Sequence, residues 1–243
     1  MLLAAYNCSI FININNVLQI VLIKMNKFLL TVCSLLLTGL TTLAANAANL
    51  KGDAAAGATK NALCTGCHGI KGYHTSFPEV HQVPKIFGQG AGYIRAALHA
   101  YKAGERKHPS MRTLASSLSE QDIADLAAYY ESTGTGATLP AIAAEGSVKV
   151  AELMTKGGCA SCHGANLSKP IDPSYPKIAG QHSDYLYVAL RAYKNTDKPM
   201  IGRGHPVMGG IAKQFSDADL KVLAAYVGGL PSEMQTLQRD RLK

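Results

Sequence analysis

The feature that most constrains this chain is a pentapeptide, Cys-x-x-Cys-His, which occurs twice. It reads CTGCH at 64–68 and CASCH at 159–163. Of the six cysteines in the chain, only Cys8 and Cys33 lie outside the pentapeptides, in an apolar N-terminal region. C-x-x-C-H is the attachment sequence of a c-type haem, whose vinyl groups form thioether bonds with the two thiols. The repetition therefore predicts two covalently bound haem c groups in one chain.

The pentapeptides also predict which residues hold each haem. The cysteines expected to bind covalently are Cys64 and Cys67 in the first copy and Cys159 and Cys162 in the second. The histidines expected to ligate the irons are His68 and His163. A thioredoxin-like dithiol would need a βαβ context, which the sequence lacks, and a shared zinc would not require a histidine at the same place twice. Disulfides across C-x-x-C would close small strained loops, so haem attachment is the favoured hypothesis.

The pentapeptides belong to a longer unit that is written twice. VPKIFGQGAGYIRAALHAYKAGER begins at Val83, and YPKIAGQHSDYLYVALRAYKNTDK begins at Tyr175. Later, LSEQDIADLAAYY at 118–130 matches FSDADLKVLAAYV at 215–227. Apolar residues recur at i, i+3, i+4 and i+7 in these segments, which is typical of amphipathic helices, and no convincing strand alternation occurs. We expect an all-α fold of two tandem domains, each a small set of helices around a haem.

The boundaries between these units follow from composition. The segment STGTGATLP at 132–140 is rich in Gly, Thr and Pro, which is typical of a linker. We place the first domain at 48–133, the linker at 134–138 and the second domain, with a C-terminal tail, at 139–243.

The first 47 residues have the pattern of a secretory signal peptide. A basic start at Met25, an apolar middle at 28–43 and the motif Ala45-Asn46-Ala47 predict cleavage after Ala47, with Met25 as the true start. The alternative is an uncleaved anchor, but the apolar run is shorter than the ~20 residues that span a bilayer. We expect export to the periplasm, with the mature chain soluble or peripherally associated with a membrane.

Two methionines are candidates for the second axial ligand. Met111 and Met208 each follow His-Pro-x and precede the last helix of a copy. A soft thioether suits Fe(II) and raises the reduction potential, as an electron carrier requires. Ligation by His108 and His205 is the alternative, and otherwise these two would be loop or supporting residues. The histidines expected in surface or loop positions are His74, His81, His99 and His182.

With these motifs in place, the sequence resembles cytochrome c4, the dihaem branch of the class I cytochromes c. The resemblance rests on the two C-x-x-C-H sites, the PKI-x-GQ loops at 84–89 and 176–181, and the LAAYY and LAAYV helices. It implies two tandem class I cytochrome c domains with His/Met ligation. It also implies the following roles: the carbonyls of Pro84 and Pro176 accept the N–H of the ligating histidines, and Ile86 and Ile178 pack on the haems. The His-bearing loop at 70–82 departs from the family pattern.

The resemblance further implies electron transfer in the periplasm, from a quinol-oxidising complex or a dehydrogenase towards a terminal oxidase. A haem subunit of a flavocytochrome-type dehydrogenase is an alternative. A dihaem peroxidase would need an open sixth position, and each copy has its own candidate methionine. The chain is basic, with a net charge of +8; this charge steers docking to an acidic partner or simply keeps the protein soluble. We expect an electron carrier rather than an enzyme, with no nucleic-acid partner.

Overall fold

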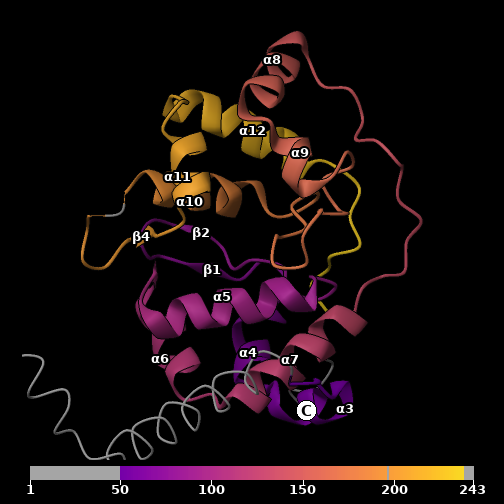
Figure 1. Ribbon diagram of the computed structural model, residues 1–243, viewed down its shortest axis with the longest axis vertical. Helices are drawn as coiled ribbons and strands as arrows, with labels where there is room; N and C mark the ends of the chain where they lie inside the picture. The colour runs from indigo at the N-terminus through magenta and orange to yellow at the C-terminus, as the bar shows by residue number, and fades with distance from the viewer. Residues whose placement is uncertain (1–49, 196, 238–243) are drawn as a thin grey trace, which may run out of the picture. The chain divides into compact units, whose positions relative to one another are not determined.

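The computed structural model describes residues 50–195 and 197–237 (Figure 1). The predicted signal peptide at 1–47, with Met25, the cleavage site after Ala47 and both extra cysteines, lies outside these residues. The chain divides into the units Met1–Leu50 and Lys51–Lys243, and the fold below is that of the second. Within the described ranges, no helix is both long and apolar enough to cross a membrane.

The two copies of the repeat fold into the same succession of helices, coloured indigo to magenta and then red to yellow in Figure 1. The helices of the first copy are α3 (Ala54–Lys60), α4 (Ala62–His68), α5 (Ala91–Ala103), α6 (Pro109–Ser116) and α7 (Glu120–Ser132). Those of the second are α8 (Val148–Gly157), α9 (Cys159–His163), α10 (Ser183–Lys194), α11 (Pro206–Ala212) and α12 (Asp217–Gly228). This confirms the predicted helical fold and its duplication.

Short paired strands supplement the helices, and the sequence did not predict them. In the loop at 70–82, β1 (His74–Thr75) pairs antiparallel with β2 (His81–Gln82). Between the copies, β3 (Arg106–Lys107) pairs antiparallel with β4 (Gly202–Arg203). Each strand has only two residues, which is too short for an alternating hydrophobic pattern to show in the sequence.

The last helix of each copy is fixed by a capping box. Ser119 precedes α7 and Ser216 precedes α12, and each serine side chain accepts a hydrogen bond from the backbone N–H three residues on, at Asp122 and Asp219. Each aspartate side chain in turn accepts a hydrogen bond from the backbone N–H of its serine. The two helices therefore begin at equivalent residues and direct the same apolar positions inward.

The buried side chains of each copy pack among themselves. The core of the first contains Phe87, Ile94, Leu126, Ala127 and Tyr130. The second has two adjoining clusters, one of Leu167, Ala179, Leu186, Ala224, Val227 and Leu230 and the other of Leu153, Phe215, Leu220 and Leu223. Many of these core residues lie at helical spacing in the sequence, and their removal from water is the main stabilising contribution to such small domains.

The two PKI-x-GQ loops bind each other reciprocally through their glutamines. Gln89 of the first copy donates to the Lys177 carbonyl (2.9 Å) and accepts from the Lys177 backbone N–H (2.9 Å). Gln181 of the second donates to the Lys85 carbonyl (2.8 Å) and accepts from the Lys85 backbone N–H (2.9 Å). One side-chain amide in each copy thus satisfies both backbone groups of a residue in the other copy, which explains why the motif recurs.

The C-terminal tail returns to the first copy. Gln235 donates its backbone N–H to the Phe87 carbonyl (3.0 Å) and its side-chain amide to the Thr133 carbonyl (2.9 Å). Thr135 in the predicted linker donates to the Glu233 carbonyl (3.0 Å). Met234 is buried between these contacts. The tail, which the repeat does not account for, therefore ties the second copy to the linker and to the core of the first.

Candidate haem sites

One cavity of about 730 Å³ is lined by both pentapeptides, and this volume lies within the range of ligand sites. The sequence-predicted residues that line it are Cys64, Cys67, His68, Pro84, Ile86 and Met111 from the first copy and Cys159, Cys162, His163, Pro176, Ile178 and Met208 from the second. The fold thus brings every predicted site residue to one hollow.

The histidines of the two pentapeptides have the same environment. His68 ends α4 and its Nδ1 lies 2.8 Å from the Pro84 carbonyl oxygen; His163 ends α9 and its Nδ1 lies 2.9 Å from the Pro176 carbonyl oxygen. A carbonyl only accepts, so Nδ1 carries the hydrogen and Nε2 keeps the lone pair that a metal needs. Burial lowers the pKa of both histidines, which favours the neutral, ligating form of the ring.

The four thiols are free of disulfides within the described part of the chain. Burial raises the pKa of Cys64 and of Cys159, the first cysteine of each pentapeptide. Nowhere in residues 50–195 or 197–237 do three His, Cys, Asp or Glu side chains gather as a metal site.

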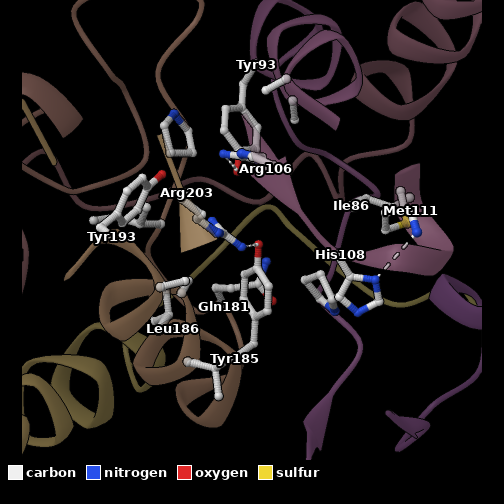
Figure 2. A pocket seen from close by; sticks show the side chains of 18 of the residues that line it. Ile86, Tyr93, Arg106, His108, Met111, Gln181, Tyr185, Leu186, Tyr193 and Arg203 are labelled. Carbon is white, nitrogen blue, oxygen red and sulfur yellow. Dashed lines mark hydrogen bonds between the residues drawn. The ribbon is translucent and has the colours of Figure 1, made fainter. Parts of the chain in front are cut away.

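Met111 and Met208 occupy the third residue of equivalent helices, α6 and α11, each preceded by a histidine. His108 accepts the Met111 backbone N–H at its Nδ1 (3.5 Å), and His205 accepts the Met208 backbone N–H in the same way (3.3 Å); Figure 2 shows the first of these bonds. A neutral ring that accepts at Nδ1 carries its hydrogen on Nε2 and has no second lone pair for iron. The two histidines thus serve as helix N-caps, and this role disfavours them as the axial ligands.

These donors fit haem c. At one continuous cavity, each copy presents two free thiols, an imidazole whose Nε2 lone pair is available, and a methionine on a helix that a histidine caps. Thiols form the covalent links, and imidazole and thioether are common axial ligands of haem iron. Ile86 and Ile178 also line the cavity and pack against the core of their own copy.

The structure corrects the expectation for His81. This residue was expected in a surface or loop position, but its side chain is only 4% exposed. It lies in β2, its ring is 6.1 Å from that of Tyr185, and the neighbouring Gln82 donates its backbone N–H to Asp184 in α10. The inserted loop is therefore packed against the second copy, and a loop residue is buried for that reason.

Sequence reasoning missed a group of aromatic and basic side chains in the cavity, several of which Figure 2 shows close together. They are Tyr93, Tyr101 and Arg106 in the first copy and Tyr185, Tyr193 and Arg203 in the second. Each residue of the first set matches one of the second when the repeats are aligned. The recurrence of a tyrosine or arginine at equivalent positions was the signal that could have identified them.

Comparisons with known proteins agree with this arrangement. The cytochrome c family matches residues 54–134 and again 147–231. Cytochrome c4 of Pseudomonas aeruginosa is 36% identical and the match covers 85% of this chain and all of that protein. The crystal structure of reduced recombinant cytochrome c4 from Pseudomonas stutzeri has a TM-score of 0.55 and 31% identity, covering 74% of this chain and all of that one. A protein of Stutzerimonas stutzeri named thiosulfate dehydrogenase electron acceptor is 29% identical, over 67% of this chain and 76% of its own length.

The two matched domains, the two attachment sequences and the similarity along most of the chain lead to one conclusion. The protein carries two covalently bound haem c groups, one for each domain, and it transfers electrons rather than acting as an enzyme. The chain belongs to the cytochrome c family, in its dihaem cytochrome c4 branch.

Proposed function

We propose that each iron is ligated on both faces by the residues that recur in the repeat. His68 and Met111 bind the first iron, and His163 and Met208 bind the second. The covalent links are made by Cys64 and Cys67 in the first domain and by Cys159 and Cys162 in the second. One observation carries this assignment. In both domains the cavity is lined by a histidine whose Nδ1 bonds to a proline carbonyl and by a methionine whose backbone N–H bonds to the histidine that caps its helix.

Haem c supplies one-electron chemistry, and the chain determines how that chemistry is used. With His68 and Met111 holding one iron and His163 and Met208 the other, no coordination position would remain for a substrate, and electron transfer would be outer-sphere. The carbonyls of Pro84 and Pro176 hold the histidine rings and increase their basicity through the Nδ1 hydrogen bond. The apolar side chains of Ile86 and Ile178 line the cavity, and an apolar wall of this kind would limit the access of water to the haem.

We further propose that the protein works in the periplasm, after removal of residues 1–47, and passes electrons towards a terminal oxidase. The donor is a quinol-oxidising complex or a dehydrogenase. The relative named thiosulfate dehydrogenase electron acceptor supports a dehydrogenase donor. The net positive charge of the chain supports docking on acidic surfaces of such partners.

The ligand assignment is tested with Met111→Ala and Met208→Ala. Each variant is expected to lose the near-infrared sulfur-to-iron band of one haem and to lower the reduction potential of that haem only. Met200→Ala is the control, because Met200 is exposed, has no counterpart in the repeat and lies outside the cavity lining. If both methionine variants keep the complete band, the assignment is wrong.

The donor is tested by rapid mixing of the oxidised protein with a reduced thiosulfate dehydrogenase or with a quinol-oxidising complex. The physiological type of donor should reduce it at rates that fall with ionic strength, because opposite charges steer the encounter. Cell fractionation and N-terminal sequencing of the mature chain test the location, with Ala48 as the expected first residue.

A further inference from the structure

Two equivalent lysines lie where the PKI-x-GQ loops of the two domains meet. Lys85 and Lys177 occupy the second position of the motif in each copy, and both line the cavity. Each side chain reaches across to the loop of the other domain. The Nζ of Lys85 donates to the Gly180 carbonyl (2.7 Å), and the Nζ of Lys177 donates to the Gly88 carbonyl (3.0 Å). The cation of Lys85 therefore lies at the second domain, and that of Lys177 lies at the first.

The cation at the first domain is neutralised by the C-terminal tail. Lys177 forms an ion pair with Glu233 (2.7 Å), and the two side chains are only 19% and 26% exposed. The tail holds Glu233 in place, because its backbone carbonyl accepts from Thr135 in the linker (3.0 Å). Salt screens such a sheltered pair much less than it screens charges at the surface. The two charges therefore cancel beside Gly88.

The cation at the second domain has no carboxylate partner in the described part of the chain. None of the ion pairs among residues 50–195 and 197–237 includes Lys85. Burial lowers the pKa of Lys85. Burial and the charge of Lys85 also lower the pKa of His182, at the start of α10, while Asp184 opposes this effect. The influence on His182 is independent evidence that the positive charge lies beside the second domain.

Other charges at the cavity do not offset this difference. The remaining lysine, arginine and carboxylate side chains that line it, where the structure describes it, are Lys60, Glu105, Arg106, Lys107 and Arg203. The two arginines occupy equivalent positions of the repeat, and Lys60 is bound by two carboxylates of α7. Glu105 and Lys107 have opposite charges and flank the same arginine. An uncompensated difference thus remains between the two loop lysines.

We propose that Glu233 lowers the reduction potential of the first haem by neutralising Lys177, whereas Lys85 raises the potential of the second. This inference rests on the proposed haem sites, which lie in the same cavity. A nearby cation stabilises the reduced iron, which carries one positive charge less than the oxidised iron, and the interaction is stronger where water is partly excluded. Transfer of an electron from the first haem to the second is therefore favoured.

The tail supplies the asymmetry that duplication alone does not. Both copies of the repeat contain the lysine, so two identical domains would place one cation at each haem site. Glu233 lies beyond the repeated segments and pairs with only one of the two lysines. Its carboxylate thus acts on the electron-transfer reaction, in addition to the packing of the tail against the first domain.

The experiment measures both reduction potentials of the holoprotein by spectroelectrochemical titration. Met111→Ala and Met208→Ala identify which potential belongs to which haem. Glu233→Gln keeps an acceptor for Lys177 but removes the negative charge, so it should raise the potential of the first haem only. Lys85→Gln keeps an N–H donor but removes the positive charge, so it should lower the potential of the second haem only.

Matched controls and a double variant separate charge from packing. Glu145→Gln and Lys71→Gln should change neither potential, because both residues are exposed and are not among those that line the cavity. Lys177→Gln leaves Glu233 as an uncompensated anion and should lower the potential of the first haem. Combining Lys177→Gln with Glu233→Gln should restore that potential, since the pair is neutral before and after the change. A purely structural role of the tail would leave the double variant shifted.

Several outcomes would overturn the proposal. Unchanged potentials in Glu233→Gln and Lys85→Gln, in variants that carry two haems, would overturn the tuning and leave the haem assignment standing. Effects on the opposite haem would overturn the placement of the two cations. Lys85→Arg keeps the charge and should keep the potential of the second haem; an equal loss in Lys85→Arg and Lys85→Gln would show that the role is structural.

Discussion

The two domains share the geometry that bears on the haems and differ in what supports it. Both hold the ligating histidine by a proline carbonyl and cap the methionine helix with a histidine. Outside these contacts, the first domain depends on polar contacts and on contacts with segments of the second domain. The second domain has the larger apolar core. After duplication, the residues around the cofactor stayed equivalent, and the scaffold around them diverged.

The clearest difference in the scaffold is at one position of the last helix. Asp125 of α7 is buried and accepts from the Asp53 backbone N–H (2.9 Å) and from Lys60 (2.7 Å), which joins α7 to α3. The equivalent residue of α12 is Val222, at the surface. The first domain thus joins its terminal helices at a buried carboxylate. In the second, α8 and α12 are joined by buried apolar residues and by the more exposed ion pair of Lys149 with Asp219 (3.2 Å).

The methionine helices are supported differently as well. The ring of His108 packs edge-on against Phe77 of the inserted loop, with centroids 5.6 Å apart. The ring of His205 instead packs against Tyr193 of α10, at 6.3 Å. The loop that bears Phe77 is itself held by the second domain, through the ion pair of Glu79 with Arg191 (2.9 Å). The ring of His108 is therefore contacted by a loop that the other domain holds, whereas the ring of His205 is contacted by a tyrosine of its own domain.

Among changes that should affect one domain more than the other, the largest loss of stability is expected in the C-terminal tail. Met234→Ala should destabilise the first domain by about 2–5 kcal/mol, because the buried side chain leaves a cavity between the two domains. Hydrogen exchange followed by mass spectrometry should show faster exchange in α7 and little change in α12. Met200→Ala, at an exposed position, is the control. Equal loosening of both helices would show that the tail does not act selectively on the first domain.

Asp125→Ala should cost the first domain about 2 kcal/mol, since it leaves the Asp53 backbone N–H without its acceptor and removes one of the two carboxylates that bind Lys60. Hydrogen bonds from Lys60, the Asp53 backbone and Gln121 lower the pKa of Asp125, and Lys60 and Ser119 lower that of Asp122 to about 2. Because these pKa values are depressed on folding, the stabilisation is present above ~pH 4 and is lost as the pH falls towards 2.

The loss of stability at low pH should differ between the two domains. The capping aspartates Asp122 and Asp219 are equivalent and should affect both alike, and Asp172 and Asp217, whose pKa values are also lowered in the second domain, are exposed. The excess acid sensitivity of the first domain is therefore expected to come from the buried Asp125. Asp125→Ala should remove that excess, and Val222→Ala should leave the second domain's acid profile unchanged. The measurement is domain-resolved hydrogen exchange between pH 5 and pH 2; identical acid profiles for both domains in the unaltered protein would refute the account.

Phe77→Ala should weaken the ligation of Met111 alone. An edge-to-face contact contributes about 0.5–1.5 kcal/mol, so the population lacking the sulfur–iron bond should rise by up to about tenfold. The near-infrared band of the first haem measures this population, and that of the second haem should not change. Val80→Ala is the matched control, since Val80 lies in the same loop and is 72% exposed. A loss of the same size at both haems would contradict the local role of the loop.

The smallest expected effect is at the ion pair that holds the loop. Glu79→Gln removes the bidentate contact with Arg191, but both side chains are more than a third exposed. The loss should be below about 1 kcal/mol and should diminish as salt is added. Exchange of the loop amides at two salt concentrations tests this, and a large, salt-independent effect would mean that the contact is structural rather than electrostatic.

The helices, the duplication and the family could be predicted from sequence because they depend on local patterns. The apolar residues of α7 and α12 recur at helical spacing, and a serine with an aspartate three residues later is a local signal for the start of each helix. The strand pairs could not be predicted, because β3 and β4 come from different repeats and have two residues each. The burial of His81 and the packing of the tail, with Met234, against the first copy likewise depend on contacts between distant segments. The sequence has no local signal for such contacts.

At the cavity, the attachment cysteines and histidines were apparent from spacing, and Met111 and Met208 from recurrence. Those four cysteines, two histidines and two methionines remain proposals as individual ligands. The roles of His108 and His205 were left open, because a histidine before proline is compatible with ligation and with capping. The tertiary structure favours capping, through an Nδ1 acceptor that the sequence could not show.

The central claim, one covalent haem c in each domain, is tested most directly by a pyridine haemochrome assay combined with intact mass. The unaltered mature chain should contain two haems. A chain with both cysteines of 64–68 replaced by alanine should contain one, and so should a chain with both cysteines of 159–163 replaced. A colourless protein with four titratable thiols, produced in cells able to attach haem c, would contradict the account.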